Sequence, residues 1–97
     1  MLIPNKFFVR VSKACIKDGE RKSTVSCPVA LAIKRSPKLR NKLKYAYVRP
    51  DYISLQFADL SNRRYELSRS VTRFIDKFDA KGKDFVKPFT FIMRDGV

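Results

Sequence analysis

The segment RSVTRFIDKFDAKG (residues 69–82) has the spacing of an amphipathic helix. Its large apolar residues recur at i, i+3, i+4 and i+7, which places them on one helix face: Val71, Phe74, Ile75 and Phe78. Ser68 or Ser70 is a suitable N-cap, and Gly82 suits the left-handed position that follows many helices. This apolar face has to be buried against another element, so we expect the helix to pack across one face of a sheet.

Other segments alternate apolar and polar residues with the period of two that indicates strands with one buried face. The first is KFFVRVS (residues 6–12), and KPFTFIM (residues 87–93) closes the chain as a strand that Pro88 places at a strand start or a sheet edge. Between them, three segments separated by turns predict an antiparallel meander: YAYVR (residues 45–49), YISLQFA (residues 52–58) and RRYEL (residues 63–67).

Two shorter regions complete the prediction. The stretch KACIKDGERKST (residues 13–24) is compatible with a short helical turn or with a surface loop. In SCPVALAIKRS (residues 26–36), Pro28 near the start and Pro37 beyond the end frame a short helix.

A further short helix could begin at Ser36 and Pro37, held down by Leu39 and Leu43. Taken together, the patterns predict an α+β fold for residues 1–97 as a single domain. We expect a small mixed or antiparallel sheet of four to five strands with two or three helices.

Charge is the unusual property of the composition. The chain carries 22 Lys or Arg, 9 Asp or Glu and no histidine, for a formal net charge of +13. Residues 1–50 hold 13 of the basic and 2 of the acidic residues, whereas residues 51–97 hold 9 and 7. Such an asymmetric excess is typical of proteins that bind phosphate or another acidic surface.

The positive charge is densest in KRSPKLRNKLKYAYVR (residues 34–49), which contains no acidic residue. Burying unpaired cations is costly and the segment offers no acidic partner, so we expect these side chains to be exposed and together. Arg63 and Arg64 could extend the patch. The candidate residues for binding a nucleic acid or another partner are Lys34, Arg35, Lys38, Arg40, Lys42, Lys44, Arg49, Arg63 and Arg64.

Tyrosines at positions 45, 47 and 52 interleave with these cations, a combination that proteins use to stack bases and neutralise phosphates of single strands. An alternating strand normally buries such rings, however. We therefore favour core packing for Tyr45 and Tyr47, with exposure as the alternative.

Nothing in the sequence favours an enzyme, a metal site or a cofactor. Without histidine there is no imidazole base for a Ser or Cys nucleophile, and the glycines form no phosphate-binding loop. Cys15 and Cys27 are too few and too far apart for a zinc site, and we expect reduced thiols. No segment has the ~18 consecutive apolar residues of a membrane span, and MLIPNKFF lacks the features of a signal peptide.

Several motifs together resemble a group of small, largely uncharacterised proteins encoded by bacteriophages and prophages. The motifs are FVRVS, Ile16 with Gly19, SCPVALAI, YELSRSVTRFIDKFD and KPFTF, and they span most of the chain. Where that group has a proline after the Glu-Leu pair, this sequence has Ser68, which can start the helix by capping instead.

The resemblance implies a context: a phage accessory protein in the cytoplasm of a bacterial host cell. Phage proteins of this size are often defence antagonists, such as anti-CRISPR proteins, or small DNA-associated regulators. Two hypotheses follow. The first is a basic, non-enzymatic protein that binds the phosphate backbone of DNA or RNA without sequence specificity. The second is a defence inhibitor that uses the same patch to dock on an acidic or nucleic-acid-binding surface of a host complex.

Overall fold

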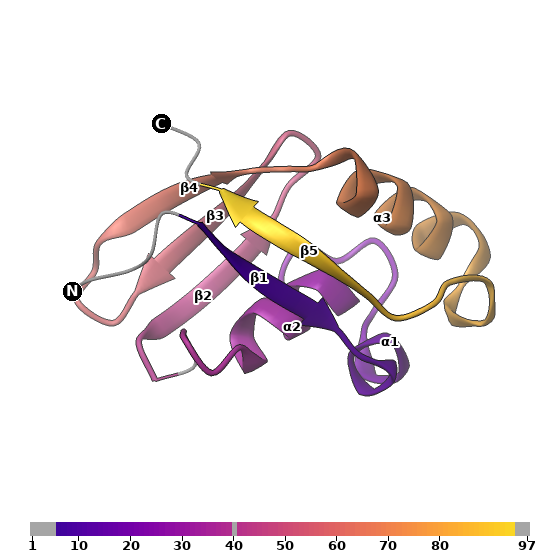
Figure 1. Ribbon diagram of the computed structural model, residues 1–97, viewed down its shortest axis with the longest axis horizontal. Coiled ribbons are helices and arrows are strands. Elements are labelled where there is room, and N and C mark those ends of the chain that lie inside the picture. Colours follow the sequence, from indigo (N-terminus) through magenta and orange to yellow (C-terminus); the bar gives the residue numbers. More distant parts are fainter. Residues whose placement is uncertain (1–5, 40, 95–97) are drawn as a thin grey trace.

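The computed structural model describes residues 6–39 and 41–94 and confirms the α+β class, with three α-helices and five strands in those ranges. Figure 1 shows their arrangement. In chain order the elements are β1 (Lys6–Val11), α1 (Lys13–Asp18), α2 (Pro28–Arg35), β2 (Leu43–Val48), β3 (Tyr52–Phe57), β4 (Asn62–Glu66), α3 (Arg69–Lys81), the 3-10 helix η1 (Lys83–Phe85) and β5 (Phe89–Arg94).

The strands form two antiparallel sheets. In one, β1 pairs with β5, so that the first and last strands of the chain lie side by side (Figure 1). In the other, β2, β3 and β4 are neighbours in sequence order, which confirms the predicted meander. The register of this sheet places Val48 opposite Ile53 and Ile53 opposite Tyr65.

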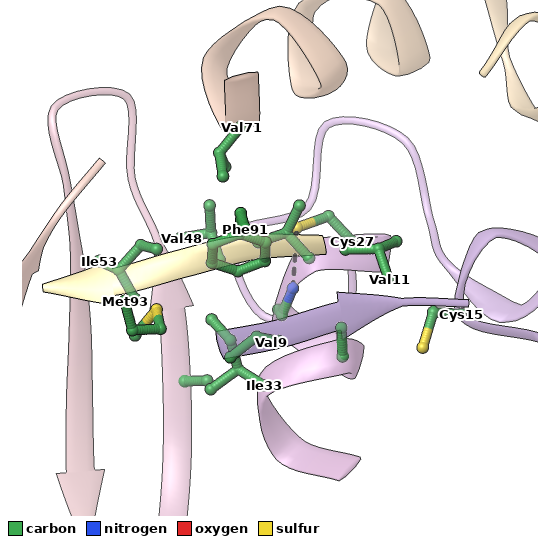
Figure 2. Close-up of a cluster of buried hydrophobic side chains, with 14 of the residues drawn as sticks. Val9, Val11, Cys15, Cys27, Ile33, Val48, Ile53, Val71, Phe91 and Met93 are labelled. Atoms are coloured by element: carbon green, nitrogen blue, oxygen red, sulfur yellow. Dashed lines mark hydrogen bonds between the residues drawn. The ribbon is translucent and has the colours of Figure 1, made fainter. Parts of the chain in front are cut away.

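One hydrophobic core lies between the two sheets. Alternate residues of β1 and β3 point into it along their whole length, as the period of two predicts. Figure 2 shows Val9, Phe91 and Met93 of the β1–β5 sheet close to Ile53 and Val48 of the three-stranded sheet, with Ile33 of α2 below and Val71 of α3 above. The two sheets are also joined by an edge-to-face contact of Phe7 with Tyr65, whose ring centroids are 5.9 Å apart.

Helix α2 is the helix that packs most closely along the strands, against β1 and β2. The Cys27 thiol caps it by accepting a hydrogen bond from the Ala30 N–H at 3.4 Å. Gly19, at the end of α1, allows α1 to approach it closely, because a Cβ at this position would be 2.5 Å from Cδ of Pro28.

Helix α3 matches the predicted helix, with Ser68 as its N-cap and Gly82 at φ +92° after its last turn. We expected it to cross one face of a sheet, and this placement is wrong. Figure 1 shows α3 beside the sheets. Val71 and Phe78 belong to the core, and the ring centroid of Phe74 is 4.8 Å from that of Phe89. The position across the strands is already occupied by α2.

The C-terminal end of α3 is held by the loop before α2. The Arg21 guanidinium donates to the carbonyl oxygen of Asp79 at 3.0 and 2.6 Å and to that of Ala80 at 3.1 Å. The Asp79 carboxylate in turn accepts the backbone N–H of Lys22 at 2.8 Å. Arg21 therefore satisfies helix carbonyls that have no partner within the helix.

The prediction of a short helix beginning at Ser36 and Pro37 is also wrong. Ser36 is the C-cap of α2, and the described residues 37–39 and 41–42 form turns. The N–H groups of Lys42 and Leu43 both donate to the carbonyl oxygen of Leu39. Leu39 is buried, so it anchors the connection in the core while the chain turns directly into β2.

Candidate nucleic-acid interface

The three-stranded sheet has one face in the core and one face turned outward. Ala46, Val48, Ile53, Leu55 and Tyr65 are buried. The residues that alternate with them therefore occupy the outer face, and the register aligns these in rows across the strands: Tyr45, Gln56 and Asn62; Tyr47, Ser54 and Arg64; and Tyr52 with Glu66.

A β-bulge in β2 explains how this face acquires its tyrosines. The register passes from Leu43 opposite Phe57 to Tyr45 opposite Gln56, which leaves Lys44 as an extra residue. Leu43 can thus pack against the core at one end of the strand while Ala46 and Val48 point inward at the other. The extra residue reverses the alternation, so Lys44 and Tyr45 are both exposed.

Our expectation that Tyr45 and Tyr47 pack in the core is therefore wrong. Tyr45 is 43% exposed and Tyr47 is half-buried, because the small Ala46 and Val48 fill the inward positions of β2 beneath α2. Both rings lie outside the core beside the cations, with Tyr45 exposed and Tyr47 half-buried.

The outward tyrosines lie next to cations. The Arg64 guanidinium carbon is 4.3 Å from the ring centroid of Tyr52, and that of Arg49 is 6.0 Å from the same centroid. Arg49 is also 5.6 Å from the ring of Tyr47. These distances are within the range of cation–π attraction.

The same pattern continues toward the bulge. The Lys44 ammonium is 5.7 Å from the ring centroid of Tyr45, and the rings of Tyr45 and Tyr47 are 5.9 Å apart at a 37° tilt. We call this surface the tyrosine–arginine face; it consists of Lys44, Tyr45, Tyr47, Arg49, Tyr52 and Arg64.

Three of the predicted site residues, Lys44, Arg49 and Arg64, meet on this face. Lys38 and Lys42 are exposed in the turns that lead into β2. Arg63 lies opposite Leu55 in the register and is half-buried, which places it on the other side of β4. Arg40 lies outside the described residues.

The remaining two predicted residues are on α2 and have partners within the fold. The Lys34 ammonium is half-buried and donates to the carbonyl oxygen of Val25 at 2.7 Å. Arg35 forms an ion pair with Asp18 at 2.9 Å. The expectation that all of these cations are fully exposed without acidic partners is thus wrong here, because α1 brings an acid from outside the basic segment.

Sequence reasoning missed the polar residues between the tyrosines and arginines. Ser54 and Gln56 on β3 and Asn62 on β4 lie in the same rows as the aromatic and basic side chains. The signal was present, because Ser54 and Gln56 alternate with the apolar residues Ile53, Leu55 and Phe57. Their short or neutral side chains leave the tyrosines and arginines as the largest groups on this surface.

A cleft of about 310 Å³ adjoins the face at Arg49. Cys27, Val48 and Ile75 contribute apolar walls, and Asp76 is on the α3 side. Burial raises the pKa of the Cys27 thiol, because the thiolate loses its hydration there. In the described part of the chain, no three His, Cys, Asp or Glu side chains are placed to hold a metal ion.

The described helices include none that is long and apolar enough to cross a membrane. Comparison with known proteins finds no matching family model, no matching characterised protein and no matching solved structure. The resemblance to phage-encoded proteins therefore stays a prediction from the sequence motifs.

Proposed function

We propose that this protein binds single-stranded nucleic acid on the tyrosine–arginine face, without base-sequence specificity and without catalysis. The observation that carries the proposal is the contact of Arg49 and Arg64 with the rings of Tyr47 and Tyr52 on an open sheet surface. Proteins that bind single strands combine cations that follow the phosphates with aromatic rings that stack the bases.

The spacing on the sheet supports this mode of binding. Neighbouring strands of a sheet are ~4.8 Å apart, and residues two apart on a strand are ~6.6 Å apart. The rings of Tyr45 and Tyr47 fit that range, with centroids 5.9 Å apart. Successive bases of an extended strand can therefore meet successive rings, while unpaired bases leave their faces open to stacking.

Arg49 and Arg64 have a double role in this proposal. Before binding, their attraction to Tyr47 and Tyr52 keeps the guanidinium groups over the face. On binding, a base can stack on the planar guanidinium itself or replace it over the ring, and the displaced cation can pair with a phosphate. Lys38, Lys42 and Lys44 add positive charge where the strand would leave the sheet.

The proposed setting, a phage accessory protein in a bacterial cytoplasm, depends on the resemblance of the sequence motifs. The lack of base specificity follows from the chemistry of the face. Stacking and phosphate contacts are available to every base, and they are the contacts that the large tyrosine and arginine side chains of this face can make.

The test is a binding series with fluorescently labelled single-stranded DNA, single-stranded RNA and duplex DNA from 50 to 300 mM salt. If Lys38, Lys42, Lys44, Arg49 and Arg64 each neutralise one phosphate, the log–log salt slope for single strands should be roughly −3.5. Affinity should be similar for different base sequences. Dissociation constants weaker than about 10⁻⁵ M for all three probes near 150 mM salt would refute the proposal.

A triple charge reversal identifies the surface. Changing Lys38, Lys42 and Lys44 to Glu should weaken binding of all sequences alike and flatten the slope to roughly −1.4, because two contacts remain. The matched control is the reversal of Arg73, Lys77 and Lys83, which are exposed on α3 and η1 and change the net charge equally. An equal loss of affinity in both variants would indicate that nucleic acid responds to net charge alone. The tyrosine–arginine face would then be better explained as a docking surface for an acidic protein.

A further inference from the structure

The β1–β5 sheet also has an outward face with aromatic and basic side chains. Its six outward residues are cross-strand pairs in the register: Lys6 with Arg94, Phe8 with Ile92, and Arg10 with Thr90. We call these six residues the ribbon face. The residues between them, Phe7, Val9, Phe91 and Met93, are buried in the core.

Phe8 is the most exposed of the large apolar side chains in the described chain, at 69%. It lies at the middle of the ribbon face, with Lys6 and Arg10 two residues away on the same strand and Ile92 opposite. The hydrogen bond of the Arg10 guanidinium is to the neutral hydroxyl of Thr90, at 3.4 Å. The face thus presents an exposed ring surrounded by three cations and contains no Asp or Glu among its six residues.

The ribbon face and the tyrosine–arginine face are on different sides of the molecule. Both sheets turn their apolar residues toward the same core, so their outer faces point away from it in different directions (Figures 1 and 2). The shortest dimension of the described chain is 19 Å. A strand bound on one face therefore leaves the other face open.

We propose that the ribbon face is a second site for single-stranded nucleic acid, and that one protein molecule can hold two strand segments together. Phe8 would stack a base, while Lys6, Arg10 and Arg94 would contact phosphates, which is the same chemistry as on the other face. Bridging rests on the proposed function of the tyrosine–arginine face, but binding on the ribbon face does not.

The charge of the ribbon face selects among possible partners. A second copy of this chain would bring three cations against three cations, which opposes self-association through this face. Phosphates two or three nucleotides apart would instead match the cations on either side of Phe8, and the ring needs a planar apolar partner that a base supplies.

The first experiment isolates this site. In a variant that carries Tyr47→Ala, Tyr52→Ala and Arg64→Glu, we expect residual binding of a labelled 20-nucleotide single strand. Adding Phe8→Ala and Arg10→Glu should reduce that residual affinity at least tenfold. The matched control adds Phe85→Ala and Lys81→Glu instead, because Phe85 is also exposed, at 55%, and the Lys81 ammonium is 5.9 Å from its ring centroid. Circular dichroism melts should show that all variants remain folded.

The second experiment measures bridging with the wild-type chain. Two short oligonucleotides, one with a donor and one with an acceptor dye, should show energy transfer that appears with protein and disappears at large protein excess. Substitutions on either face should abolish the signal. Sedimentation of the free protein as a dimer that Phe8→Ala dissociates would overturn the proposal in favour of self-association.

The outcomes separate the two proposals. Unchanged residual binding after loss of Phe8 and Arg10 would overturn the ribbon site and leave the tyrosine–arginine face unaffected. Wild-type affinity in the variant without Tyr47, Tyr52 and Arg64, followed by loss with the ribbon substitutions, would support the ribbon site and reject the proposed function. If neither set of substitutions weakens binding of the single strand, both proposed sites are rejected.

Discussion

The two ends of the basic segment, residues 34–49, have the same kind of side chains in opposite surroundings. At the α2 end, Lys34 donates to a backbone carbonyl and Arg35 pairs with Asp18. At the β2 end, Arg49 lies over the rings of two tyrosines on an outward sheet face. The cations at the α2 end have partners within the fold, whereas Arg49 at the β2 end belongs to the face on which we propose binding.

The difference teaches that the density of charge along a sequence does not define a surface. Lys34 and Arg35 follow the buried residue Ile33 on a helix, so loop and α1 groups lie within their reach. Arg49 follows Val48 at the end of a strand, and its guanidinium lies near the rings of Tyr47 and Tyr52 on the outer face of the sheet. We therefore expect substitutions at the first end to change stability and those at the second to change binding.

The largest effect on stability should come from the core. It gives the scale against which the stability changes at the two ends of the basic segment are compared. Phe74 and Phe78 are 8% and 2% exposed, as the helix pattern predicted. Replacing Phe78 with Ala should lower the free energy of unfolding by about 3–5 kcal/mol, a large share of what a small domain has. Urea denaturation monitored by circular dichroism measures this. A loss below about 1 kcal/mol would mean that α3 is not packed as described.

The largest effect on binding should come from the tyrosines of the outer face. Changing Tyr47 and Tyr52 together to Ala removes two stacking platforms at about 1–3 kcal/mol per base, so affinity for single strands should fall at least about 30-fold. The melting temperature should change little, since both rings point away from the core. The control changes the same two residues to Phe, which keeps the rings; an equal loss there would assign binding to the hydroxyls.

These tyrosines also show what a sequence can and cannot predict. The strands, the meander and helices α2 and α3 follow from local periodicity and capping, and each is found within a few residues of its predicted bounds. The sequence does not decide between a helical turn and a loop for α1, and the helix expected at Ser36 is not found. Periodicity also indicates that a strand has two faces, but not which face is buried. In β2 that choice depends on the bulge at Lys44 and on the placement of α2, which are properties of the assembled fold.

The candidate site divides in the same way. Its cations and tyrosines were all identifiable from composition, and Lys44, Arg49 and Arg64 do come together. The ion pair of Arg35 with Asp18 was not identifiable, because it joins α2 to α1 across 17 residues. Long-range partners of this kind become visible only when the helices are packed.

A smaller effect is expected at the α2 end. Replacing Lys34 or Arg35 with Ala should lower stability by no more than about 1 kcal/mol each, because the ion pair is half-exposed and its charges are screened. Affinity for single strands should change less than threefold. Thermal melts and binding titrations on the same samples measure both quantities. An affinity loss as large as that of the tyrosine variant would contradict the assignment of the α2 end to stability and the β2 end to binding.

The smallest effect is expected at the two cysteines, and it still bears on the comparison. Cys15 and Cys27 are free, buried thiols, and burial raises the pKa of Cys27. Each Cys→Ser variant should bind single strands as the wild type does. Both thiols should react with a disulfide reagent at pH 8 far more slowly in the native protein than in urea, because a buried thiol must first become exposed.

The labelling rates can then distinguish the two cysteines. The Cys15 sulfur is 3.8 Å from the Arg35 guanidinium, whereas Cys27 caps α2 at its other end. Arg35→Ala removes this cover and the tie to Asp18, so it should raise the labelling rate of Cys15 severalfold and leave that of Cys27 unchanged. Mass spectrometry of the labelled peptides separates the two sites. Equal acceleration at both would mean that Arg35 stabilises the whole fold instead of its own end of the segment.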